Sequence, residues 1–198
     1  GSQNTACGEG ALSANTTAGN NTGIGFQALE NNTTGASNTA VGSFALDANT
    51  TGNFNDAFGK SSLSANTTGG SNVAIGSGTL NANTTASNNT AVGANALTAN
   101  TTGTQNTAIG AIALDANQVG SNNNAFGYGA LSASTVSDNN AFGAFALHSN
   151  TTGTNNTGVG HRVMISNTTG IQNTAVGALS LDANTTGDKN TACGEGSL

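Results

Sequence analysis

The feature that most constrains this chain is a motif that returns every 17 residues. Near copies of N-T-A-V-G-S-F-A-L-D-A-N-T-T-G stand at 38–52, 89–103 and 173–187. A glycine closes each N-T-A-V-G-like pentad, at Gly8, Gly25, Gly42, Gly59, Gly76, Gly93, Gly110, Gly127, Gly143, Gly160, Gly177 and Gly194. Every step is 17 residues except the one from Gly127 to Gly143, which is 16. We therefore treat residues 1–198 as one tandem-repeat domain. Because the chain begins and ends inside a repeat, we expect it to be a segment of a longer protein.

A unit of this length is too short for a helical hairpin repeat but suits one coil of a β-solenoid. The residue before the glycine is mostly Val, Ile or Phe, which favour strands, and Leu or Met stands four residues after it. The sequence thus predicts an all-β parallel β-solenoid of about twelve 17-residue coils. Within each coil we expect two short strands, N-T-A-V-G and x-A-L-x-A, with N-T-T-G as the closing turn.

Asparagine recurs at two places in the repeat. Stacked coils put equivalent residues about 4.8 Å apart, so a recurring Asn predicts a ladder of side-chain amides along the axis. The first predicted structural ladder consists of Asn4, Asn21, Asn38, Asn55, Asn72, Asn89, Asn106, Asn123, Asn139, Asn156, Asn173 and Asn190. A second Asn opens N-T-T, and Ser134 is the exception among the complete copies.

Two adjacent positions in each pentad are restricted to apolar residues or glycine. Neighbouring side chains of a strand point to opposite sides, yet Ala108 and Ile109 exemplify positions that stay apolar or glycine in all copies. We expect one face to fill the coil and the other to fill an intersubunit core. The limit of the first position to Ala or Gly also predicts backbones pressed close together along the oligomer axis, so we expect a homo-oligomer.

The two residues after the marker glycine vary most from copy to copy. Positions that escape a strict repeat are commonly exposed, and an adhesive protein would place its contacts there. The candidate surface contacts are Phe44, Tyr128, Phe145, His161 and Arg162. The aromatic residues near the short repeat admit two interpretations, either packing that repairs an irregular coil or a contact with a carbohydrate or protein.

The two cysteines occupy the same repeat position at opposite ends of the chain. In a straight rod Cys7 and Cys193 would lie roughly 53 Å apart, too far for a disulfide within one chain. One interpretation is a pair of buried thiols that replace Val. The other is end-to-end stacking, in which both act as intersubunit thiols near the joint of a filament.

Charge and spacing argue against several functional classes. The net charge is −6 and only Lys60, Arg162 and Lys189 are basic, so we expect no nucleic-acid partner. No apolar run is long enough for a membrane span. The acidic residues are scattered, and His148 and His161 have no cysteine or regular acidic partner. We therefore expect no enzyme, no metal site and no cofactor.

The motif N-T-A-[VI]-G-x-x-A-L-x-x-N-T-T-G-x-x resembles the tandem repeats of phage tail-fibre and bacterial surface proteins. It is also similar to the head repeats of YadA-like trimeric autotransporter adhesins, which share the N-x-x-[AV]-[IV]-G core. This resemblance implies a left-handed β-roll wound as a trimer. It further implies an extracellular location, on a cell surface or virion, with a cell-surface receptor or glycan as partner.

Three functions remain open on the sequence. The first is a non-catalytic, structural and adhesive rod segment of a tail fibre or surface adhesin. The second is an ice-binding solenoid that uses Thr ladders, although T-T presents only one Thr per coil outward. The third is the subunit of a self-assembling extracellular filament.

Overall fold

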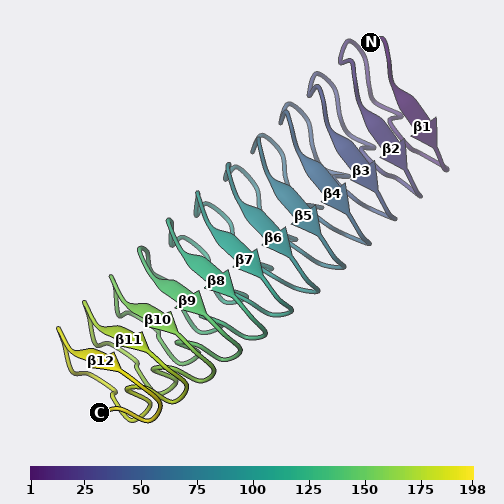
Figure 1. Ribbon diagram of the computed structural model, residues 1–198. Coiled ribbons are helices and arrows are strands. Elements are labelled where there is room, and N and C mark those ends of the chain that lie inside the picture. The colour runs from purple at the N-terminus through teal and green to yellow at the C-terminus, as the bar shows by residue number, and fades with distance from the viewer.

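The computed structural model describes all residues from 1 to 198 and forms one parallel β-solenoid without a helix. A single sheet runs in the order β1 to β12, each strand pairing in parallel with its chain neighbours (Figure 1). The strands are β1 Thr5–Cys7, β2 Thr22–Ile24, β3 Thr39–Val41, β4 Asp56–Phe58, β5 Val73–Ile75, β6 Thr90–Val92, β7 Thr107–Ile109, β8 Asn124–Phe126, β9 Asn140–Phe142, β10 Thr157–Val159, β11 Thr174–Val176 and β12 Thr191–Cys193. The predicted β-solenoid of 17-residue coils is confirmed, with about eleven turns.

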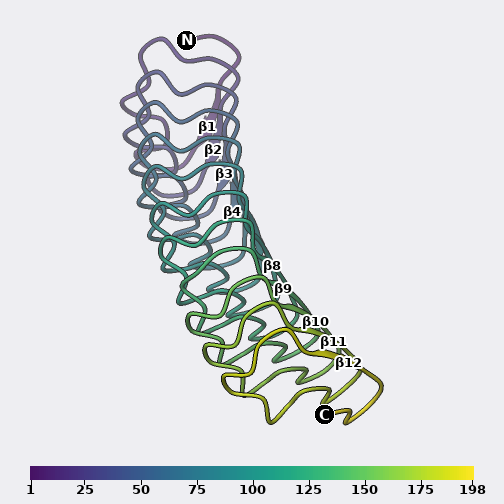
Figure 2. The ribbon, with the colours of Figure 1, turned by 90° about the vertical axis from the view of Figure 1, so that its left-hand side faces the viewer.

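The coils stack in a single file, and the two termini lie at opposite ends of the rod (Figure 2). Equivalent residues of successive repeats pair directly, for example Ala91 with Ala108 and Val92 with Ile109. Parallel pairing without an offset follows from the repeat itself, because a slip by one residue would turn Ala108 out of the core and the larger Ile109 into it.

The prediction of two strands per coil is wrong, since each coil contains one strand of three residues. The x-A-L-x-A segment is a series of turns in which the Leu backbone is left-handed, with φ of 54° at Leu29 and 50° at Leu97. Left-handed φ is unfavourable for a branched side chain and incompatible with a strand. Hydrogen bonds between coils nevertheless continue there: the Leu97 N–H donates to the Ala113 carbonyl at 3.0 Å.

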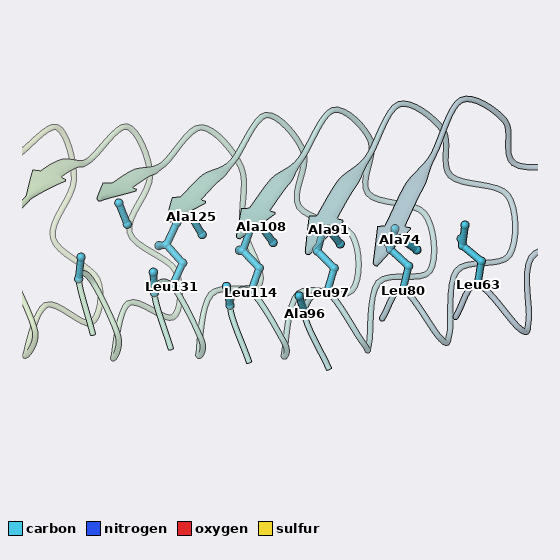
Figure 3. Close-up of a cluster of buried hydrophobic side chains, with 14 of the residues drawn as sticks. Leu63, Ala74, Leu80, Ala91, Ala96, Leu97, Ala108, Leu114, Ala125 and Leu131 are labelled. Carbon is cyan, nitrogen blue, oxygen red and sulfur yellow. The ribbon is translucent and has the colours of Figure 1, made fainter. Parts of the chain in front are cut away.

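The core is a narrow column inside the coils. A regular coil contributes one Leu and two Ala, such as Leu97, Ala91 and Ala96, and all three are fully buried (Figure 3). The Leu side chains follow one another along the axis. Because a single coil encloses so little apolar volume, each coil depends on its two neighbours to exclude water.

The restriction of the strand centre to Ala or Gly has its cause inside the coil. Ala108 is fully buried in the chain's own core, so the prediction that this small residue marks close backbones at an intersubunit axis is wrong. Gly158 shows the volume limit directly. A Cβ there would meet Val163 Cγ1 at 2.9 Å and Met164 Cε at 3.2 Å. Glycine therefore replaces Ala in the coil whose other core residues are larger than usual.

Candidate functional site

The first Asn of each repeat joins its coil to the next. The side-chain Oδ1 of Asn106 accepts the backbone N–H of Asn123 at 3.0 Å, and its Nδ2 donates to the Gly120 carbonyl at 2.8 Å. The Oδ1-to-backbone contact repeats at all eleven steps, from Asn4 to Asn190. These buried amides therefore form a continuous first ladder that links every coil to its neighbour.

The Asn that opens N-T-T forms a second ladder by amide-to-amide contacts. Asn100 Nδ2 donates to Asn83 Oδ1 at 3.1 Å and to the Gly103 carbonyl at 3.0 Å. The Oδ1 of Asn100 accepts from Asn117 Nδ2 at 3.1 Å. The residue three positions after each Asn is Gly or Ala, except in the short repeat. At Gly103 the close approach favours glycine, because a Cβ there would meet Asn100 Oδ1 at 2.5 Å.

The second ladder is interrupted in the short repeat. Ser134 stands in place of Asn, and Val136 takes the place of the small residue, since it accepts the equivalent bond from Asn123 Nδ2 at 2.8 Å. Asn117 Oδ1 and Ser134 Oγ are buried there without a hydrogen-bond partner. These two polar atoms lack the partners that their counterparts have elsewhere.

The outer face of the sheet carries an apolar file along the whole rod. Its members are Cys7, Ile24, Val41, Phe58, Ile75, Val92, Ile109, Phe126, Phe142, Val159, Val176 and Cys193, which we call the outer stripe. Side chains in the middle of the rod remain exposed, with 42% for Ile75 and 37% for Ile109. No position of the stripe holds a charged or amide residue, although each faces outward.

The threonines of N-T-T present one outward file. The first Thr turns its hydroxyl to the next coil, as when Thr50 Oγ1 donates to the Thr67 carbonyl at 3.0 Å. The second, such as Thr51, is exposed. Most coils thus offer one outward Thr hydroxyl on this side, and Val119 and Val136 interrupt the file in two successive coils.

A surface pocket of about 400 Å³ lies just past the short repeat. It is lined by Phe145, His148, His161, Arg162 and Ile165. These residues follow the marker glycines of two successive coils, so the parallel stacking brings them together. Both histidines of the chain and its single arginine line this pocket.

Aromatic contacts hold one wall of the pocket. Phe145 makes edge-to-face contacts with Tyr128, at a ring separation of 5.2 Å, and with His148, at 5.4 Å. His148 Nδ1 lies 3.0 Å from the Gly129 carbonyl. In the neutral ring Nδ1 therefore carries the proton, which leaves Nε2 without a proton on the opposite edge. A Cβ on Gly129 would meet the Phe145 ring at 3.2 Å, so glycine makes room for this arrangement.

Of the predicted surface contacts, the structure brings four together and separates one. Tyr128, Phe145, His161 and Arg162 lie in or beside the pocket, whereas Phe44 packs edge-to-face on Phe26 elsewhere on the rod. His148 and Ile165 were missed because they stand five residues after the marker glycine, outside the most variable pair. The signal that could have predicted them is their 17-residue spacing, which places His148 and Ile165 at the same position of successive coils.

The two cysteine side chains are exposed. The interpretation of Cys7 and Cys193 as buried thiols is therefore wrong, because their position belongs to the outer stripe rather than the core. Their role as intersubunit thiols at an end-to-end joint stays a prediction.

Three further observations concern one carboxylate, metal binding and membranes. Asp47 has a pKa raised above its ordinary 3.8, chiefly because burial disfavours the carboxylate and secondarily because Glu30 is nearby. No group of three or more His, Cys, Asp or Glu side chains is arranged to hold a metal ion. The structure also contains no helix long and apolar enough to span a bilayer.

Comparison of the chain with protein-family models, with curated proteins and with solved structures found no match. The resemblance to tail-fibre and adhesin repeats therefore stays a sequence hypothesis, while the β-solenoid with 17-residue coils is established by the fold itself.

Proposed function

We infer that this chain is a non-catalytic, structural and adhesive rod segment that assembles with further copies of itself. The observation that carries this proposal is the outer stripe, an exposed apolar file that no charged residue interrupts over twelve strands. A soluble surface rarely keeps a long contiguous apolar file unless something covers it.

The spacing of the stripe supports one kind of partner. Its side chains repeat with the rise of a parallel sheet, about 4.8 Å, over twelve strands. A partner that fits every step needs a surface with the same period and the same length. A second copy of the chain has both, so we assign the stripe to contact between parallel rods, as predicted for one of the two apolar faces.

The resemblance to adhesin repeats supplies the remaining parts of the proposal. It supports three chains per assembly, a left-handed winding, and a place outside the cell, on a cell surface or a virion. A rod of about 55 Å would then set the reach of a binding surface. The single outward Thr file gives less support to ice binding, which would be recognised by thermal hysteresis.

Light scattering on the purified chain tests self-association. The expected mass is about three times the chain mass of 19.1 kDa. Ile109→Glu should bring the mass toward 19.1 kDa, because a carboxylate inside a dry contact between rods is not solvated. Circular dichroism should stay unchanged, since Ile109 is 37% exposed in the single chain.

Gln105→Glu is the matched control in the same coil. Gln105 is exposed, and its equivalents Asp138 and Lys189 already carry charges with the same left-handed φ. This variant should keep the mass of the assembly. A wild-type chain that is folded and monodisperse at 19.1 kDa would contradict the proposal.

A further inference from the structure

We propose that the pocket lined by Phe145, His148, His161, Arg162 and Ile165 binds a sugar that carries a carboxylate. This inference does not rest on self-association, because the pocket is built within one chain. Its residues follow the marker glycines, whereas the stripe residues precede them.

The distribution of cationic residues is the first argument for an anionic ligand. The chain carries a net charge of −6 with three Lys or Arg and two His. Three of these five residues line the pocket. Arg162 and His161 are exposed. The guanidinium is therefore free to bind a carboxylate with two parallel N–H donors, the geometry that Arg provides best.

The aromatic wall is the second argument, and it points to a ring rather than a bare anion. Phe145 is held between Tyr128 and His148 by edge-to-face contacts. Tyr128 is 51% exposed beside it. Flat apolar surfaces of this kind pack against the C–H face of a sugar ring, while polar groups at the rim select the substituents.

Arrangement and size are the third argument. The Gly129 carbonyl holds His148 Nδ1 at 3.0 Å, so the imidazole is oriented before a ligand arrives and needs no ordering on binding. A pocket of about 400 Å³ is at the small end of ligand sites, which run from about 300 to 1,000 Å³. One sugar unit with a carboxylate near Arg162 and its ring against Phe145 matches this shape.

Three probes separate binding of the carboxylate from binding of the sugar ring. Methyl β-glucuronide has the ring and the carboxylate, methyl β-glucoside keeps only the ring, and acetate keeps only the carboxylate. In NMR titrations of the labelled chain, the glucuronide should shift the Arg162 and His148 side-chain signals. We expect its affinity to be about tenfold higher than that of either reference, which corresponds to about 1.4 kcal/mol.

The repeat itself provides substitutions that the backbone accepts. Gln27 holds the place of Arg162 in another coil, with φ of 55° against 56°, so Arg162→Gln should fold normally. It should weaken glucuronide binding about tenfold. Phe145→Asn copies Asn95, which has φ of 56° at the equivalent position, and should remove the preference for glucuronide over acetate.

Two further variants make the test specific. Lys60→Gln removes an exposed positive charge from a distant coil and should change binding less than about twofold, because the charge lies beyond the screening length. Asp182 is the repeat equivalent of Ile165 in the next coil. Asp182→Asn should therefore strengthen binding about twofold by removing a nearby like charge.

Three results would overturn the proposal. The first is no binding of the glucuronide. The second is equal affinity for glucuronide and acetate, which would indicate an anion site without a sugar preference. The third is an equal loss for Arg162→Gln and Lys60→Gln, which would show only the net charge of the rod.

Discussion

The regular coils around residues 89–123 and the short coil between Gly127 and Gly143 stack on their neighbours in the same way but close with different turns. In the regular coils both Asn ladders are continuous, and Asn100 reaches partners on both sides. In the short coil the first ladder continues, since the Asn139 N–H donates to Asn123 Oδ1 at 3.0 Å. The second ladder is interrupted at Ser134 and resumes where Asn167 Nδ2 donates to Asn150 Oδ1. The two ladders are therefore not equally necessary for the fold.

The missing residue is absorbed entirely in the closing turn. Across the deletion Asn124 pairs with Asn140 and Phe126 with Phe142, in the same register as elsewhere. The Leu131 N–H also reaches the Ala146 carbonyl at 3.0 Å, as its counterparts do in other coils. The backbone contacts of strand and core thus fix the stack, and the turn is the part that adapts.

The largest expected effect comes from the second ladder. Asn100→Ala should lower the free energy of unfolding by about 1–3 kcal/mol, because the buried Asn83 Oδ1 loses its donor. Ser134→Ala, at the equivalent place in the short coil, should cost almost nothing, since Ser134 Oγ has no partner to lose. Urea unfolding of both variants measures the difference. If both variants lose the same free energy of unfolding, the break in the second ladder at Ser134 does not affect stability.

A smaller effect is expected from the rings that flank the short coil. Phe126 and Phe142 stack at 4.9 Å on the paired strands β8 and β9. Phe142→Val copies the residue at Val159 and should cost about 0.5–1.5 kcal/mol from the lost ring pair. Ile75→Val, in a stripe position without a ring pair, should stay within about 0.5 kcal/mol. If thermal unfolding separates the two variants in the reverse order, the rings do not support the short coil.

The smallest effect concerns a half-buried carboxylate in a regular coil. The pKa of Asp47 is raised by burial, and its Oδ1 lacks a partner. Between 3.8 and the raised value the folded chain holds more protons than the unfolded one, so this group's contribution to stability falls as pH rises through that window. Asp47→Asn should therefore stabilise the chain at pH 7 by no more than about 0.5 kcal/mol, with the gain disappearing below the ordinary pKa.

Asp115→Asn provides the control for that comparison. Asp115 occupies the equivalent position but accepts a hydrogen bond from Ser132 Oγ at 2.6 Å. Removing its charge weakens a charge-assisted bond, so this variant should not gain stability at pH 7. A gain of the same size in both variants would assign the effect to net charge.

The sequence was sufficient for the fold because the period and the strand residues point to one architecture. It was not sufficient for the x-A-L-x-A segment. The Ala and Leu of this segment are compatible with a strand. The left-handed φ of Leu97 is required only because the chain must close the coil around a narrow core. The inward direction of Ala108 likewise depends on the position of Leu in the same coil, which periodicity alone does not reveal.

The pocket residues also fall into two groups, those that the sequence predicts and those that it does not. Variability after the marker glycine pointed to Phe145, His161 and Arg162, since a strict repeat makes exceptions visible. The inclusion of His148 depends on a bond to the Gly129 carbonyl one coil away, and that contact arises only once the coils are stacked. Phe44, selected by the same variability, lies in a part of the rod without a pocket.

Each strand touches only the strand before it and the strand after it. An in-frame duplication or loss of one repeat in the gene would therefore add or remove one coil without disturbing the others. The tolerance of the closing turn extends this freedom even to the loss of a single codon.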